Sequence, residues 1–209
     1  MDKIILGLLI LKRLTVYEIR TIIKKNFQPM CSDSLGSIQA AVKKLLAAQM
    51  LTCSEYVEKG INKKRYSITN MGRKALLDWL QIPADLADSK NMELGKLLFM
   101  GLVPAGKRSA LMDEMIARLE TELAFLLGVR ATVDAKEAAT TEIGEVLGYW
   151  KNDKEYYEGI QNATQNPDMT ENLNDIEYFQ IATLQYGIDS LKFHIKWLKT
   201  LKKKMSGKT

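Results

Sequence analysis

The stretch from Ser32 to Thr69 constrains the fold more than any other part of the chain. It begins with apolar residues at helical spacing and continues with two runs rich in Thr, Val, Tyr and Ile, Leu51 to Glu58 and Lys64 to Thr69. Gly60 and Asn62 lie between these runs. A helix followed by an antiparallel hairpin is therefore predicted. The helical positions are Leu35, Ile38, Val42, Leu45 and Leu46.

Three further helices complete this predicted module. Residues Ile4 to Leu11 are apolar at helical spacing, so a first helix is expected to end near Arg13. The sequence Thr15-Val16-Tyr17-Glu18 matches a capping box and predicts the start of a second helix. Thr69 or Asn70 caps a fourth helix after the hairpin. Three helices, a hairpin and a closing helix predict a winged helix-turn-helix over residues 1–82.

The net positive charge of the chain lies in this first part. Residues 1–82 hold 14 Lys/Arg and 6 Asp/Glu, for a formal charge of +8, whereas residues 83–209 have a formal charge of −3. A basic domain is the expected binder of a polyanion. The predicted partner is double-stranded DNA.

The predicted third helix carries small and cationic side chains opposite its apolar side. Small residues allow the helix to approach DNA closely, Gln can pair with adenine in the major groove, and Lys can pair with phosphate or guanine. The cations near the hairpin turn, with Lys59 among them, are placed to contact phosphates or the minor groove. An ordinary solvated face is the alternative for the helix. The predicted DNA-binding residues are Tyr17, Lys24, Lys25, Ser34, Gly36, Ser37, Gln39, Ala40, Lys43, Lys44, Lys63, Lys64 and Arg65.

Residues 83–209 are predicted to form a helical, coiled-coil-like dimerisation domain. Its last helix has apolar residues at alternating steps of three and four, which is typical of a two-helix seam. We expect this seam to pair with a second copy of the chain, and internal packing is the alternative. The fold class is thus mainly α with a small β hairpin. The predicted dimerisation residues are Ile181, Leu184, Ile188, Leu191, Ile195 and Leu198.

Four segments resemble the PadR family of bacterial transcriptional regulators. They are Ile5-Leu6-Gly7-Leu8-Leu9, Tyr17-Glu18-Ile19, the third helix from Gly36 to Leu45, and Arg65-Tyr66-Ser67-Ile68-Thr69-Asn70-Met71-Gly72-Arg73. Two departures are Thr15-Val16, where the family usually has His-Gly, and Gln39-Ala40, where many members have Tyr-Pro. Because the second departure lies in the reading helix, the resemblance does not carry over an operator sequence.

The resemblance implies the longer type of family member, with a helical C-terminal dimerisation domain. It further implies a regulator, usually a repressor, that binds a pseudo-palindromic operator and responds to a small hydrophobic or aromatic effector. Trp79, Tyr149, Trp150 and Trp197 are candidates to line an effector pocket. Core packing is the simpler explanation for these four residues.

The sequence offers no recognisable enzyme chemistry. It has no Gly-rich phosphate loop and no HExxH motif, and His194 is its one histidine. Cys31 and Cys53 provide neither a disulfide framework nor a metal set, so no cofactor or metal is expected. The apolar run at the N-terminus is too short for a membrane span, and a cytoplasmic protein is expected. A winged-helix module for protein–protein assembly is the alternative function.

Overall fold

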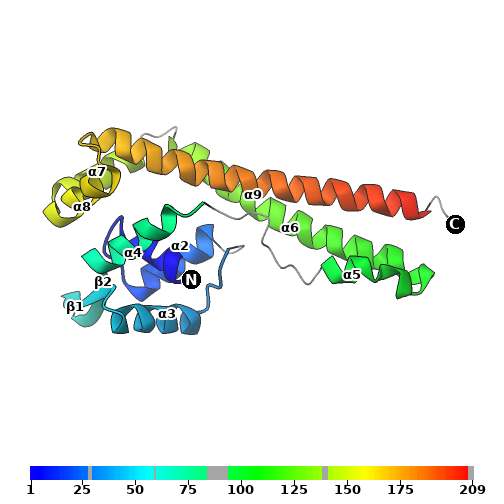
Figure 1. Cartoon of the computed structure of the whole chain (residues 1–209), viewed down its shortest axis with the longest axis horizontal. Helices are drawn as coiled ribbons and strands as arrows, with labels where there is room; N and C mark the ends of the chain where they lie inside the picture. The colour runs from blue at the N-terminus through cyan, green and yellow to red at the C-terminus, as the bar shows by residue number, and fades with distance from the viewer. Residues whose placement is uncertain (28–29, 59, 84–93, 138–140, 207–209) are drawn as a thin grey trace. The chain divides into compact units, whose positions relative to one another are not determined.

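The computed structural model describes residues 1–27, 30–58, 60–83, 94–137 and 141–206, and it is mostly helical with one two-stranded antiparallel sheet (Figure 1). The predicted fold class is confirmed. The elements follow the order α1 (Asp2–Leu9), α2 (Val16–Asn26), α3 (Leu35–Ala47), β1 (Leu51–Glu58), β2 (Ile61–Ile68), α4 (Asn70–Leu80), α5 (Leu94–Leu98), a 3-10 turn (Met100–Leu102), α6 (Ala105–Glu137), α7 (Thr141–Lys151), α8 (Lys154–Thr164) and α9 (Met169–Ser206).

The chain forms two compact units, and neither is continuous in sequence. The first unit contains residues 1–83 and 136–176, and the second contains residues 84–135 and 177–209. The predicted winged helix therefore shares its unit with residues 136–176, which the sequence interpretation assigned to the second domain. The long helices α6 and α9 each contribute residues to both units.

One apolar core holds the winged helix together. It is built from one side of each of the first three helices, together with the ends of the hairpin strands and Leu76 of α4. Burying each Leu or Ile side chain contributes roughly 1.5–3 kcal/mol, so this core fixes which side of each helix faces solvent. Its fully or nearly fully buried members include Ile5, Leu6, Leu9, Ile19, Ile23, Ile38, Val42 and Ile68.

Side-chain caps begin α2, α3 and α4, and those of α2 and α4 are where the sequence predicts. Thr15 accepts a hydrogen bond from the Glu18 amide, and the Glu18 carboxylate accepts one from the Thr15 amide at 2.7 Å. The predicted capping box is confirmed. Ser34 and Thr69 accept equivalent bonds at the starts of α3 and α4. These bonds satisfy amides that have no partner within the helix.

The hairpin is longer and more tightly turned than expected. The second strand begins at Ile61, not at Lys64, and pairs in register from Glu58↔Ile61 to Leu51↔Ile68. Gly60 has φ +76° at the turn, in the left-handed region that glycine tolerates. Leu14 and Tyr66 exchange both backbone hydrogen bonds, at 3.2 and 2.8 Å, so the segment after α1 extends the sheet by one bridge.

In the second unit, α9 packs along α6 through the apolar seam that the sequence predicted for a partner subunit. Ile195 and Leu198 join Met112 and Ile116 of α6 in one core, and Ile188 and Leu191 join Leu126 in another. Ile181 and Leu184, the other two predicted dimerisation residues, are partly buried. Leu184 packs against the second of these cores, so five of the six seam positions are engaged within the chain. The helix also begins at Met169, earlier than its apolar repeat indicates.

Within the described ranges, no helix combines the length and apolarity that crossing a lipid bilayer would require.

Candidate nucleic-acid interface

The solvent-exposed side of α3 is formed by residues that the sequence assigned to DNA reading. Gln39, Ala40 and Lys43 are exposed, whereas Ile38, Val42 and Leu45 on the opposite side are buried. Burial of one side fixes the rotation of the helix about its axis. The three exposed side chains therefore have a defined direction, and Gln39 and Lys43 make no ion pair or side-chain hydrogen bond with another residue of the described ranges.

The N-terminal turn of α3 combines a serine cap with small exposed residues. The Ser34 hydroxyl accepts from the Ser37 amide at 3.2 Å and donates to the Ser37 hydroxyl at 2.8 Å. Both serines are thus engaged in starting the helix. Gly36 is exposed between them, and a methyl group added there would meet open space. A phosphate approaching this turn would meet backbone amides and the positive end of the helix dipole.

The second helix contributes an aromatic ring and two cations. Tyr17 lies in its first turn and is 69% exposed. Lys24 and Lys25 lie in its last turn and are also exposed. The Arg20 guanidinium donates to the Asp33 carbonyl at 3.1 Å and so ties α2 to the segment that leads into α3.

Two lysines of the hairpin, which we call the wing (residues 51–68), are paired with carboxylates of the same hairpin. Lys63 is ion-paired with Glu58, and Lys64 lies 3.3 Å from Glu55, its direct cross-strand partner. The hydrogen bond with Glu58 raises the pKa of Lys63 and lowers the pKa of Glu58, and the bond with Glu55 raises the pKa of Lys64. Lys63 and Lys64 therefore remain charged, but each has a counter-charge beside it.

Two other predicted phosphate contacts are also engaged within the chain. The Arg65 guanidinium stacks over the Tyr56 ring, 4.4 Å from its centroid. Lys44 of α3 is ion-paired with Asp2 of α1 at 2.6 Å. Lys59, which the sequence placed near the hairpin turn, lies outside the described residues. Of the predicted cations, Lys24, Lys25 and Lys43 are the exposed ones for which no carboxylate of the described ranges lies within ion-pair distance.

The four aromatic residues proposed for an effector pocket have different surroundings. Trp150 is fully buried and its indole N–H donates to the Leu11 carbonyl at 2.9 Å, and Tyr149 packs in the same core. Trp79 is half exposed, with the Lys3 ammonium 5.6 Å from its ring centroid. Trp197 belongs to the second unit. Core packing, the simpler explanation, accounts for Tyr149 and Trp150.

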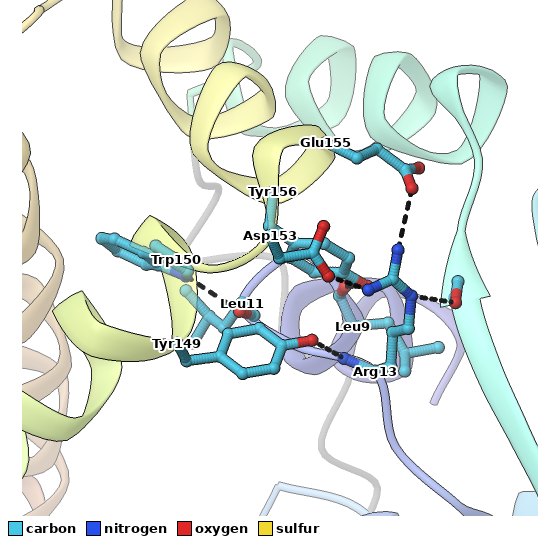
Figure 2. A network of polar contacts seen from close by, with 9 residues as sticks. Leu9, Leu11, Arg13, Tyr149, Trp150, Asp153, Glu155 and Tyr156 are labelled. Carbon is cyan, nitrogen blue, oxygen red and sulfur yellow. Dashed lines mark hydrogen bonds and ion pairs between the residues drawn. The ribbon is translucent and has the colours of Figure 1, made fainter.

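A polar network connects the end of α1 with α7 and α8 inside the first unit, as Figure 2 shows. Tyr156 donates to the Leu9 carbonyl at 3.0 Å, Trp150 donates to the Leu11 carbonyl, and the Arg13 amide donates to the Tyr149 hydroxyl at 3.2 Å. These bonds satisfy backbone groups at the C-terminal end of α1, which has its last residue at Leu9 and not near Arg13.

Sequence reasoning missed this network. Its bonded partners lie 136 to 147 residues apart in the sequence. The periodicity of apolar residues predicts only which residues of a single helix or strand lie on the same side. One signal was present: Tyr149-Trp150 is followed closely by Tyr156-Tyr157, and buried Tyr and Trp side chains need polar partners.

Among the residues that the structure describes, no group of three or more His, Cys, Asp or Glu side chains is placed to hold a metal ion.

Solved structures of transcriptional regulators share this fold over nearly the whole chain. Bacillus subtilis PadR in complex with operator DNA is 19% identical, with 98% of each chain covered and a TM-score of 0.68. The same protein with p-coumaric acid gives 17% identity, 98% coverage of each chain and a TM-score of 0.63. A PadR-like regulator from Bacillus cereus is 19% identical, with 100% and 99% covered and a TM-score of 0.64.

The Vibrio cholerae virulence activator AphA is 16% identical, with 100% of this chain and 99% of that one covered, and has a TM-score of 0.69. No family model and no curated protein matches the sequence. The chain therefore has the fold of PadR-type winged-helix transcriptional regulators, and the resemblance drawn from its sequence is confirmed at the level of the fold. At these identities the likeness is one of fold.

Proposed function

We propose that this chain is a sequence-specific DNA-binding transcriptional regulator that acts in the cytoplasm without a cofactor and without catalysis. One observation carries the proposal: α3 presents Gln39, Ala40 and Lys43 to solvent from a helix whose opposite side is locked in the core. The excess of positive charge in residues 1–82 supports it. The fold shared with regulators, one of them solved on operator DNA, supports it further.

The proposed complex places α3 in the major groove. Gln39 has the donor and acceptor needed to bind the edge of an adenine, and Ala40 leaves room for the base beside it. Lys43 reaches a phosphate or a guanine. Tyr17, Lys24 and Lys25 of α2 contact the backbone next to the groove, and the wing follows the adjacent phosphates or the minor groove.

We further propose that the protein binds a pseudo-palindromic operator as a homodimer. Because α6 occupies most of the predicted α9 seam, the partner subunit must use another face. Phe179, Tyr186 and Phe193 are exposed on α9 at intervals of seven residues, and the exposed Trp197 follows one turn later. A heptad interval keeps such residues on one side of a helix over a long distance.

The charge along α9 favours an antiparallel pairing of two copies. Residues 169–189 contain four acidic and no basic residues, and residues 190–206 contain six lysines and no acidic residue. Antiparallel helices place each acidic half beside the partner's basic half, whereas parallel helices place like charges together. A two-fold dimer then presents two copies of α3 to half-sites about 34–36 Å apart.

The proposed regulatory outcome is repression relieved by a small hydrophobic or aromatic effector. It rests on the resemblance to the PadR family and on the p-coumaric acid bound to one protein of the same fold. The Vibrio cholerae protein of the same fold is an activator, so the fold is compatible with both repression and activation. The position of the operator relative to the promoter would decide which of the two occurs. An effector would act by binding better to a conformation that cannot engage both half-sites.

The test is binding of the purified protein to a fluorescent duplex carrying its own upstream region, compared with a scrambled duplex of equal length. If each subunit neutralises about four phosphates, the slope of log K against log salt is roughly −7. We expect tighter, salt-dependent binding to the upstream duplex at a stoichiometry of two chains. Equal binding to both duplexes, or none, would contradict the proposal.

A protein–protein assembly module is the second candidate, because the wing tip exposes Val57 and Ile61. Such a module would retain its partner after Gln39→Ala and would show no preference among DNA sequences. A change of base preference in Gln39→Ala would exclude it and would establish α3 as the reading helix.

A further inference from the structure

Arg13 lies where three elements of the first unit meet, between α1 and α2 (Figure 2). One terminal nitrogen of its guanidinium is ion-paired with Asp153, which directly precedes α8, and the other lies 2.9 Å from a carboxylate oxygen of Glu155. Its Nε donates to the Ser67 hydroxyl of β2 at 3.1 Å. A single side chain thus joins α8 to the wing.

The position of this guanidinium is strongly determined. The Arg13 side chain is 30% exposed and that of Asp153 is 17% exposed, so the pair is shielded more than a typical surface ion pair. The planar guanidinium matches several acceptors at once, and its carbon lies 4.9 Å from the centroid of the buried Tyr156 ring. The two carboxylates next to it carry more negative charge than its single positive charge, so Arg13 is not a free cation for phosphate.

The backbone beside Arg13 belongs to the wing as well. Leu14, the next residue, exchanges two hydrogen bonds with Tyr66, and Tyr66 is the neighbour of Ser67. The base of the wing is therefore attached to Arg13 twice, through the chain and through the Ser67 hydroxyl. A movement of α8 that displaces the guanidinium acts directly on β2.

We infer that Arg13 is a positioning residue for the wing, held in place by Asp153 and Glu155 of the α7–α8 segment. The contribution of the wing to DNA binding then depends on two carboxylates that take no part in the proposed DNA interface. This inference rests on the proposed function for its effect on DNA binding. The effect on the wing itself is a property of the free protein and can be measured without DNA.

The first experiment is hydrogen exchange of the β2 amides in the full-length protein. Asp153→Asn removes the charge that holds Arg13, Ser67→Ala removes its bond to the wing, and the double variant removes both. We expect each single change to speed exchange at Tyr66 and its neighbours about three- to tenfold. The double variant should exchange no faster than the faster single variant, because both changes break the same connection.

Glu158→Gln is the matched control. Glu158 lies on the same helix and pairs with Lys154 at 3.5 Å within α8, so its substitution removes the same charge without touching Arg13. Wing exchange in this variant should equal that of the wild type. Glu155→Gln provides a second, milder test if Asp153→Asn reduces the overall helix content.

The second readout is affinity for the upstream duplex. Asp153→Asn and Ser67→Ala should each weaken it by about threefold to tenfold, again without adding in the double variant. Unchanged wing exchange in Asp153→Asn, or effects that multiply in the double variant, would overturn the role of Arg13. A wild type that binds no DNA would instead overturn the proposed function, and the exchange data would still decide whether Arg13 holds the wing.

Discussion

The ammonium group of Lys44 lies 2.6 Å from a carboxylate oxygen of Asp2, whereas Lys43, its neighbour on α3, has no carboxylate of the described ranges within ion-pair distance. Contact with a phosphate would require Lys44 to give up or share this partner. We therefore expect Lys43→Ala to weaken DNA binding more than Lys44→Ala. A loss of about 1 kcal/mol for Lys43 and less for Lys44, measured by fluorescence anisotropy, would fit. Asp2→Asn is the control and should increase the effect of Lys44→Ala.

The carboxylates of the wing are expected to limit its affinity for DNA. Glu55 and Glu58 pair with Lys64 and Lys63, and they also repel phosphates. Glu55→Gln and Glu58→Gln should each tighten binding to every duplex and steepen the salt dependence, whereas Lys63→Ala and Lys64→Ala should do the opposite. Glu122→Gln, a change on α6, controls for overall charge. Weaker binding by Glu58→Gln would show that the ion pair is needed to shape the wing.

Tyr156 gives the first unit a specific sensitivity to alkaline pH. Burial raises the pKa of its hydroxyl from 10.0 to about 12. Since folding favours the neutral phenol, the stability that this group contributes is complete below pH 10 and is lost as the pH rises through 12. The loss is roughly 2–3 kcal/mol in full.

Chemical unfolding of wild type and Tyr156→Phe between neutral and alkaline pH tests this dependence. At neutral pH the variant should be less stable by about 1 kcal/mol, because the Leu9 carbonyl loses its donor. As the pH rises from 10 towards 12 the two curves should converge and then cross, because the wild type loses roughly 2–3 kcal/mol that the variant, which has no hydroxyl to ionise, keeps. Parallel curves over the whole range would mean that Tyr156 does not titrate as its burial predicts.

Arg73 of α4 is a buried cation with unpartnered donors. It is 7% exposed, and its two terminal nitrogens have no hydrogen-bond acceptor among the described residues, although its guanidinium lies 5.0 Å from the Tyr156 ring centroid. Burial lowers its pKa. Because unpaired buried donors are costly, Arg73→Met should leave the free energy of unfolding unchanged or raise it by up to about 1 kcal/mol.

Gly159 provides the control for Arg73. A methyl group at Gly159 would lie 2.5 Å from a terminal nitrogen of Arg73. Gly159→Ala should therefore lower the free energy of unfolding when Arg73 is present. In the double variant with Arg73→Met it should have little effect on that free energy. A large loss of stability in Arg73→Met alone would show that stacking on Tyr156 outweighs the unpaired donors.

The exposed aromatic residues of α9 are expected to hold the dimer together. Phe193 is 62% exposed and lies on the proposed dimer face, whereas Ile195 is buried against α6. Phe193→Glu should yield monomers in analytical ultracentrifugation and weaken operator binding, with helix content retained. His194→Glu adds the same charge beside it, off the proposed heptad positions, and should remain dimeric. A dimeric Phe193→Glu would place the interface elsewhere.

Local sequence signals predicted most of the winged helix. The cap of α2 at Thr15, the apolar side of α3 and the start of the hairpin at Leu51 each depend on residues close together in the chain. Long-range relationships were not predictable in the same way. The residues around Ile188 and Ile195 do not indicate whether these side chains pack against α6 or against a second subunit. Either partner would bury the same apolar repeat.

For the polar side chains of the candidate interface, too, the sequence predicts local features but not long-range contacts. Their types and positions on α2, α3 and the wing follow from the sequence. The pairing of Lys44 with Asp2 and the attachment of Ser67 to Arg13 depend on which elements pack together. Charge counts alone therefore overstate the number of cations available for DNA.

The bond from Tyr156 to the Leu9 carbonyl spans 147 residues. At a synthesis rate of roughly 5–20 residues per second, a nascent chain waits on the order of ten seconds or more between making the acceptor and making its donor. During that interval the end of α1 has neither its aromatic donors nor the side chains that bury Ile10 and Leu11. The winged helix is thus synthesised well before α7 and α8, yet the bonds at the end of its first helix form only once Tyr149, Trp150 and Tyr156 have been made.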